Sequence, residues 1–210
     1  RALVIEPEVL LLDEPFGALD KNLRDHMRIE LRDLQRKLNI STIFVTHDQD
    51  EALSMSDRIV VMEKGKICQI GAPNEIYEKP ASVFVAGFMG LSNIFSAKCT
   101  EIKRAKKTIE CEGLTIEIEN EKLNKNDKIS VMIRPENIEI YKKKNNSKKG
   151  DFFGLIKSKI YLGSTIQYQV EIKDGPVVLI NVNNSKFLNY QDFSPDEEVW
   201  VNLSKNAIYP

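Results

Sequence analysis

Hydrophobic and polar residues alternate along this chain in two different ways, and the change comes near residue 90. Residues 9–12 are continuously apolar, which is typical of a strand buried on both faces of a parallel sheet. Apolar residues then recur at three- and four-residue steps over residues 21–38, with charges between them. This spacing predicts an amphipathic helix with Asp20 as its N-cap. Residues 42–46 follow as a second strand, so the order predicts a parallel βαβ unit.

Shorter elements complete the first part. We expect a short helix over residues 50–56. A hairpin should follow, with strands at 58–62 and 67–70 joined by the turn Glu63-Lys64-Gly65-Lys66. Pro73 should open another short helix, and Pro80 should end it.

From about residue 94 the apolar residues occupy every second position. This alternation recurs in short segments separated by turn residues, which predicts a small β-barrel or sandwich. The clearest segments are 108–111, 115–119, 138–140, 166–172, 177–182 and 199–203. Residues 87–92 form the expected joint. We therefore predict an α/β domain over residues 1–90 and an all-β domain over residues 91–210.

Composition and charge limit the classes of function that this chain can have. The chain has 210 residues and a net charge of −1, which argues against bulk attraction to nucleic acid. No apolar run approaches the roughly 20 residues that span a bilayer. The three cysteines lack CxxC spacing, which suits a reducing compartment and predicts no metal site. Residues 142–149, KKKNNSKK, are interpreted as a solvated loop rather than a nucleic-acid contact. Because the chain begins with Arg1 and shows no signal segment, we expect a piece of a longer protein.

Two adjacent carboxylates follow the first strand, where open α/β sheets place ligands. Asp13 could hold Mg²⁺ through a water, and Glu14 could polarise a water for attack on phosphorus. A pair of acids in a surface turn is the alternative. His47 ends the next strand, and adjacent parallel strands bring their carboxyl ends together, so we expect His47 near Glu14. His26, in the middle of a helix, is interpreted as structural.

At this point a family resemblance emerges. LLLDEPFGALD (residues 10–20), followed by IFVTHDQDEALSMSDRIVVMEKGKI (residues 43–67), resembles the ATP-binding subunit of ABC importers. The resemblance implies that Asp13 is the Walker B aspartate, Glu14 the catalytic glutamate and His47 the switch histidine. It places Gly17 and Asp20 in the D-loop, and it implies that both, with Asp13 and His47, contribute to cofactor binding.

The second part of the chain has its own resemblance. Residues 131–136 and 161–164 are similar to the TOBE domain, the OB-like regulatory tail of importer ATPases. The implied fold is the C-terminal half of a P-loop NTPase α/β domain followed by an OB-like TOBE β-barrel. The implied cofactors are ATP and Mg²⁺. The implied partners are a second ATPase subunit in a homodimer, two transmembrane permease subunits and, indirectly, an extracytoplasmic solute-binding protein. The resemblance places the ATPase subunit at the cytoplasmic face of a bacterial membrane and implies no nucleic-acid partner.

The sequence also departs from the family. It contains neither GxxxxGK[ST] nor an LSGGQ-like segment, so the loop that cradles phosphates is missing. We therefore expect these 210 residues alone neither to bind ATP tightly nor to hydrolyse it. The missing strands should leave the sheet around residues 10–12 unpaired on one side.

The solute is inferred by kinship alone. Residues 82–90 and 93–95 are similar to the spermidine/putrescine importer ATPases, whereas residues 133–137 are shared by sugar, sulfate and ferric-iron relatives. Two other classes stay open. One is a ligand-binding β module with an inactive ATPase remnant, for which Arg134, Lys157 and Lys159 are candidate anion ligands, although solvated surface is the favoured interpretation. The other is a soluble ABC ATPase of translation or DNA repair, which the β tail and near-neutral charge disfavour.

Overall fold

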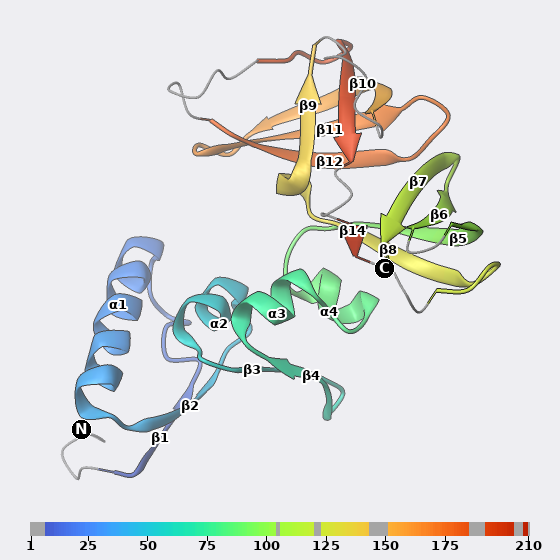
Figure 1. The fold of residues 1–210 in the computed structure, drawn as a ribbon. Helices are drawn as coiled ribbons and strands as arrows, with labels where there is room; N and C mark the ends of the chain where they lie inside the picture. The colour runs from blue at the N-terminus through green and yellow to red at the C-terminus, as the bar shows by residue number, and fades with distance from the viewer. Residues whose placement is uncertain are drawn as a thin grey trace. The chain divides into compact units, whose positions relative to one another are not determined.

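A computed structural model of the chain describes residues 7–103, 106–119, 123–142, 151–184, 192–203 and 208–209. The chain divides into two compact units, residues 1–90 and residues 91–210 (Figure 1). The first unit mixes helices and strands, and the second consists almost wholly of strands. The predicted order of an α/β part followed by an all-β part is therefore observed.

The first unit contains four strands and four helices in its described residues. In chain order they are β1 (Val9–Asp13), α1 (Lys21–Leu38), β2 (Ser41–Val45), α2 (Gln49–Met55), β3 (Ile59–Glu63), β4 (Lys66–Gly71), α3 (Pro73–Glu78) and α4 (Val83–Phe88). Strands β1 and β2 pair in parallel, as the βαβ pattern predicts. Strands β3 and β4 form a separate antiparallel hairpin.

Local signals fix the ends of these elements. The carboxylate of Asp20 accepts a hydrogen bond from the backbone N–H of Leu23 at 3.0 Å and so caps α1. The helix ends at Asn39, whose φ of 51° is the left-handed conformation common at helix C-termini. The hairpin turn has positive φ at both Lys64 (49°) and Gly65 (77°), as a type I′ turn requires.

The predicted burial of β1 on both faces is wrong in this structure. Leu10 is buried, but Leu11 is 70% exposed and Val9 is 49% exposed. The helices of this unit lie on one side of its strands in Figure 1, so the described chain covers one face of the β1–β2 pair and leaves the other bare. Helix α1 buries no residue completely, although its apolar spacing is that of a packed helix.

The hydrophobic core of the first unit lies between the β3–β4 hairpin and the last helices. Its buried members are Ile59, Val61, Ile76, Val85 and Met89. Helix α4 is missing from the sequence-based prediction, because its six residues, VFVAGF, are too few to show a helical period. The hydroxyl of Ser82 caps it by accepting from the N–H of Val85 at 3.3 Å. Packing of Val85 into the core then stabilises it.

The second unit contains ten strands arranged as two five-stranded sheets in its described residues. The strands are β5 (Asn93–Lys103), β6 (Lys106–Cys111), β7 (Leu114–Glu119), β8 (Lys128–Ile133), β9 (Ile138–Tyr141), β10 (Asp151–Tyr161), β11 (Thr165–Ile172), β12 (Val177–Asn183), β13 (Glu198–Leu203) and β14 (Ile208–Tyr209). Their orders are β12-β11-β10-β13-β9 and β14-β8-β5-β6-β7, with every pair antiparallel. Five antiparallel strands is also the strand number of an OB fold.

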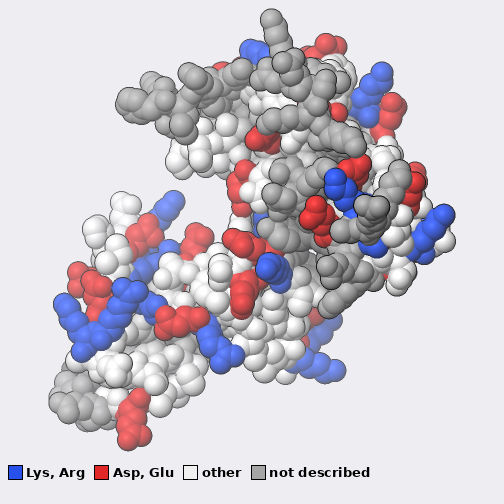
Figure 2. Space-filling view, viewed as in Figure 1, with Lys and Arg blue, Asp and Glu red and all other residues white. Residues whose placement is uncertain are grey.

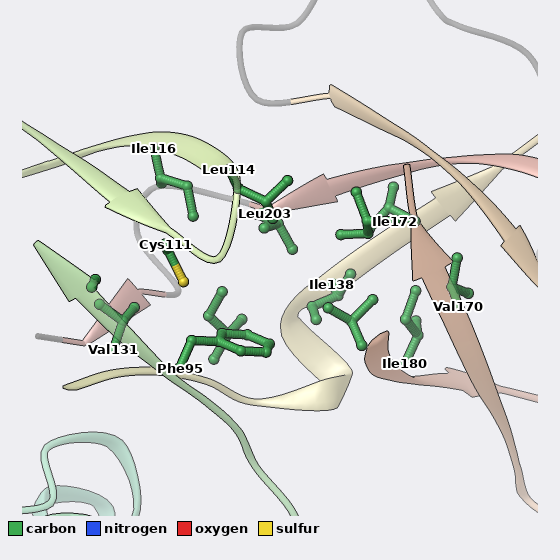
Figure 3. Close-up of a cluster of buried hydrophobic side chains, with 14 of the residues drawn as sticks. Phe95, Cys111, Leu114, Ile116, Val131, Ile138, Val170, Ile172, Ile180 and Leu203 are labelled. Atoms are coloured by element: carbon green, nitrogen blue, oxygen red, sulfur yellow. The ribbon is translucent and has the colours of Figure 1, made fainter. Parts of the chain in front are cut away.

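One hydrophobic cluster joins the two sheets. In Figure 3, Phe95 and Val131 from one sheet share this cluster with Ile172 and Ile180 from the other. The period-two pattern is responsible, since β7 and β11 bury every second side chain. Of the polar insert at 142–149, only Lys142 lies within the described residues; its ammonium group pairs with the carboxylate of Glu197 at 2.9 Å.

Candidate functional site

The carboxyl ends of β1 and β2 lie side by side. Asp13, the last residue of β1, is in register with Val45, the last residue of β2. The pairing continues one residue further, because the backbone N–H of Glu14 donates to the carbonyl of Val45 at 2.9 Å. The parallel register therefore brings the segment after β1 next to the segment that contains His47.

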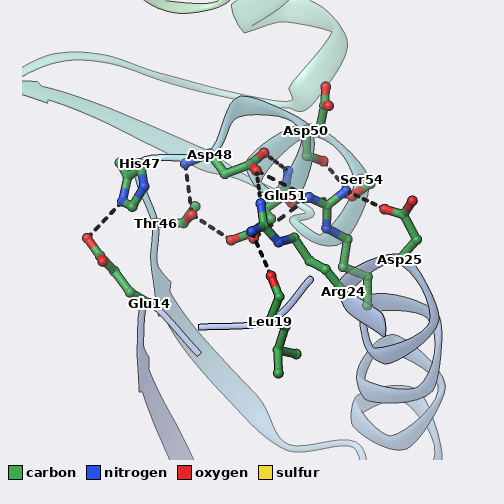
Figure 4. A network of polar contacts seen from close by, with 11 residues as sticks. Glu14, Leu19, Arg24, Asp25, Thr46, His47, Asp48, Asp50, Glu51 and Ser54 are labelled. Carbon is green, nitrogen blue, oxygen red and sulfur yellow. Dashed lines mark hydrogen bonds and ion pairs between the residues drawn. The ribbon is translucent and has the colours of Figure 1, made fainter. Parts of the chain in front are cut away.

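The side chains of Glu14 and His47 are in contact, as the sequence predicts. Oε1 of Glu14 lies 2.9 Å from Nδ1 of His47 (Figure 4). Both side chains reach solvent, with 51% of Glu14 and 75% of His47 exposed. The hydrogen bond to Glu14 and its negative charge raise the pKa of His47 above 6.5. The carboxylate of Glu14 and the exposed imidazole of His47 therefore lie next to each other at the carboxyl ends of β1 and β2.

The backbone at Glu14 is in a conformation that most residues avoid. Its φ is 42°, in the left-handed region. Such conformations cost free energy and are concentrated at functional sites. Gly17 follows closely: its N–H donates to the carbonyl of Glu14 at 3.1 Å, and a Cβ there would lie 3.8 Å from Oε2 of Glu14. The turn that contains Gly17 therefore folds back over the carboxylate.

The remaining predicted site residues lie close by with different surroundings. Asp13 is exposed at the end of β1. A single carboxylate with room for water suits Mg²⁺, which keeps several waters and takes few protein ligands. Within the described residues, no group of three or more His, Cys, Asp and Glu side chains could hold a metal by itself. Asp20 caps α1, and Phe16 anchors the same turn by packing against Phe44 with ring centroids 5.9 Å apart.

A network of ion pairs borders the site, and the sequence analysis missed it. Arg24 and Arg28 of α1 both contact Oδ2 of Asp48, at 3.2 and 3.3 Å. Thr46 donates to the buried carboxylate of Glu51 at 2.6 Å and accepts from the N–H of Asp48 at 3.0 Å. The available signal was the i, i+4 spacing of the two arginines, together with the acidic residues that follow His47.

A cleft of 1030 Å³ extends from the site along β2, on the side of this strand away from β1. Residues 41–48 of the β2 segment and residues 58–62 of the β3 segment line it. These strands belong to different two-stranded sheets. Apolar side chains on both strands are left uncovered, including Ile43 at 59% exposed and Met62 at 54% exposed. Among the described residues β1 and β2 pair only with each other, so the outer edge of β2 is open and the outer edge of β1 is unpaired, as expected for the sheet around residues 10–12.

The candidate anion ligands of the second unit do not converge. Arg134 is 1% exposed, which contradicts the favoured interpretation of solvated surface. Its guanidinium donates to the Ser92 hydroxyl at 2.6 Å and thus anchors the last residue of the joint. Lys157 pairs with Glu171 at 2.6 Å, and Lys159 pairs with an aspartate on another segment. Each lysine already has a carboxylate partner.

On the face drawn in Figure 2, basic and acidic side chains are interspersed on both units. This fits the net charge of −1. No helix among the described residues is long and apolar enough to cross a membrane.

Comparison with known proteins identifies the relatives of this chain. Residues 131–209 match the TOBE domain family. A protein of Photobacterium profundum named "Spermidine/putrescine import ATP-binding protein PotA" is 44% identical over 201 residues, which cover 95% of this chain and 53% of that protein. Proteins of the same name from Vibrio cholerae and Clostridium acetobutylicum are each 43% identical, over 95% and 88% of this chain and 52% and 50% of their own length.

The chain thus spans about half the length of the curated relatives it matches. Among solved structures, the cytoplasmic molybdate-binding protein ModG resembles it with a TM-score of 0.47 and 10% identity, over 56% of this chain and 96% of that one. Over nearly its whole length the chain is therefore similar to the ATP-binding subunits of spermidine/putrescine importers, and its second unit matches the TOBE domain family.

Proposed function

We propose that this chain is part of an ATPase subunit that drives the import of polyamines such as spermidine and putrescine. The observation that carries the proposal is the 2.9 Å contact between Glu14 and His47 at the carboxyl ends of two neighbouring parallel strands. Ligands of open α/β sheets bind at this position. The names of the relatives supply the nucleotide and the solute.

In the proposed mechanism Glu14 orients a water molecule and accepts its proton. Its carboxylate is exposed and has a hydrogen-bond partner in His47, so it can face both a water and the imidazole. His47 orients the carboxylate and can donate to a terminal phosphate oxygen when protonated. The contact with Glu14 raises the pKa of His47, so this imidazole keeps its second proton to a higher pH than a free histidine does.

Asp13 would hold Mg²⁺ through a water molecule, and the ion would neutralise charge on the phosphates of ATP. The exposed carboxylate at the end of β1 fits this role. Gly17 and Asp20 would contribute to the nucleotide site from the turn that follows Glu14. Because Asp20 already caps α1, a nucleotide that contacts this turn would also act on the start of that helix.

We infer that the rest of the ATPase domain covers the open face of the first unit. The cleft between β2 and β3 has an open strand edge and uncovered apolar side chains. Burial of such a surface is favourable by about 25 cal/mol per Å². The relatives are nearly twice as long as this chain, which leaves enough polypeptide to supply a phosphate-binding loop. The 210 residues alone should therefore show no ATP turnover.

The remaining features of the importer follow from kinship. The intact subunit would form a homodimer on two transmembrane permease subunits at the cytoplasmic face of the membrane. A solute-binding protein outside would deliver the polyamine. The second unit would be regulatory. Sugar, ferric iron or sulfate is the alternative solute, but the names of the relatives favour polyamines.

The test is a Glu14→Gln substitution in a subunit extended to the length of the relatives. Loss of a general base should lower kcat at least about 100-fold, with little change in nucleotide affinity. Glu30→Gln on α1 is the matched control, because Glu30 is exposed and the charge change is identical. Hydrolysis by the Glu14→Gln subunit at the rate of the control would refute the role of Glu14. Hydrolysis by the 210-residue chain would refute the need for the missing half.

A further inference from the structure

The contact between Glu14 and His47 is not held by burial. Both side chains reach solvent, and Glu14 is on a backbone with a φ of 42°. An exposed pair of this kind contributes little by itself and loses side-chain entropy when it is ordered. Other groups must therefore fix the two segments that carry these side chains.

Arg24 connects those two segments. One terminal nitrogen of its guanidinium donates to the carbonyl of Leu19 at 3.0 Å, in the turn that follows Glu14. The other donates to Oδ2 of Asp48 at 3.2 Å, in the residue that follows His47. A planar guanidinium with several donors can bridge two acceptors in this way. In Figure 4 Arg24 lies between Leu19 and Asp48, on the side of the loop away from His47.

The acceptor loop is itself rigid. Oδ1 of Asp48 accepts from the N–H of Glu51 at 3.1 Å, and Thr46 bonds both Asp48 and Glu51. Arg28 supplies a second cation at 3.3 Å from Asp48. Burial raises the pKa of Asp48, but the hydrogen bond from Glu51 and the charges of Arg28 and Arg24 outweigh it and lower the pKa. Asp48 is therefore an anion at neutral pH and keeps both arginines.

We propose that Arg24 is a positioning residue that sets the distance between Glu14 and His47 by joining the turn at Leu19 to the loop at Asp48. This inference rests on the proposed function, because it assigns Arg24 to the same site. Arg24 touches neither Glu14 nor His47 in the hydrogen bonds that the structure describes; it acts through the backbone of both segments. Its removal should let the two side chains separate while α1 stays folded.

The test measures the pKa of His47 by NMR in the 210-residue chain and in an Arg24→Met variant. The sequence has two histidines, His26 and His47, so a His26→Gln chain assigns the ring signals. Loss of the contact with Glu14 should lower the pKa of His47 toward 6.5. Loss of a nearby positive charge, without any movement, would raise the pKa instead. The direction of the change therefore separates positioning from simple electrostatics.

A Glu14→Gln chain provides the reference for a broken contact. We expect Arg24→Met to produce more than half of the pKa change that Glu14→Gln produces. Arg32→Met is the matched control, since Arg32 lies on the same helix and pairs with Asp57 at 2.5 Å, away from the loop at Asp48. The pKa of His47 should stay unchanged in that control. An unchanged or increased pKa in Arg24→Met would overturn the proposal and leave the proposed function standing.

Two further outcomes are decisive. If Arg24→Met loses its helical circular dichroism, Arg24→Lys replaces it, because a lysine keeps the charge but cannot bridge two acceptors with a planar fork. A lower pKa of His47 in Arg24→Lys supports the proposal, and an unchanged one refutes it. If Glu14→Gln itself leaves the pKa of His47 unchanged, the pair does not form in solution. Both the positioning role and the observation behind the proposed function then fail.

Discussion

Asn93 holds the two sheets of the second unit together, and its removal should be costly. The side chain is 5% exposed. Its amide donates to the carbonyl of Leu179 at 2.8 Å and accepts from the N–H of the same residue at 2.7 Å. It also donates to the carbonyl of Ile133 at 3.3 Å. Leu179 lies in β12 and Asn93 in β5, which belong to different sheets. The Asn93 side chain therefore links the two sheets by hydrogen bonds to the backbone of Leu179.

The magnitude follows from these bonds. An Asn93→Ala chain leaves the N–H and carbonyl of Leu179 without their partner, and each unsatisfied buried group costs about 1–3 kcal/mol. Leu179 is only half-buried, so water can reach part of the gap. We therefore expect the free energy of unfolding of the second unit to fall by about 2–3 kcal/mol. This is a large fraction of the roughly 5–15 kcal/mol that stabilises a domain.

Urea unfolding followed by tryptophan fluorescence measures this loss. The chain has a single tryptophan, Trp200 in β13, so the signal reports on the second unit alone. Asn181→Ala is the matched control, because Asn181 is half-buried and its side-chain oxygen accepts one hydrogen bond, from the amide of Gln167 at 3.1 Å. It should cost less than about 1 kcal/mol, since water can replace that partner. Equal losses in the two variants would refute the role of Asn93.

Two more predictions concern titration and reactivity. The folded-state pKa of His47 lies above 6.5, so its contact with Glu14 stabilises the site fully below that pH and is lost as the pH rises through the raised pKa. An NMR pH titration of the Glu14 amide should therefore show that the contact weakens as the pH rises. A contact that strengthens with rising pH would contradict the pairing of His47 with Glu14. Among the thiols, Cys99 and Cys111 are completely buried, and burial raises the pKa of Cys111 to about 11, whereas Cys68 is only half-buried. Iodoacetamide at pH 8 should therefore alkylate Cys68 first, as mass spectrometry can establish, with all three reacting in denaturant; rapid labelling of Cys111 in the native chain would show that the core is open.

Local patterns in the sequence were enough to predict the elements around the site. The helix over residues 21–38 was predicted with both ends correct, because Asp20 is a capping residue and the apolar period is local. The contact between Glu14 and His47 was also predictable. Parallel strands that are neighbours must bring their carboxyl ends together, whatever separates them in sequence. Their chemical roles stay predictions.

Other features required the tertiary structure. Arg134 was interpreted as solvated surface, yet it is buried against Ser92, because a charged residue after a strand gives no local sign of what covers it. The bare face of β1 depends on which segments pack against it. A continuous apolar run shows only that the strand can be buried on both sides.

The sequence by itself therefore determined the elements around the site, the two periodicities of the chain, the parallel pairing of β1 with β2 and the contact between Glu14 and His47. Tertiary structure alone decided that Arg24 bridges the turn at Leu19 and the loop at Asp48, and that Asn93 joins two sheets through Leu179. The physical reason is the distance along the sequence over which each kind of interaction acts. Caps and periodicity act over a few neighbouring residues, whereas a polar side chain takes its partner from whichever backbone or carboxylate the folded chain brings within hydrogen-bond distance.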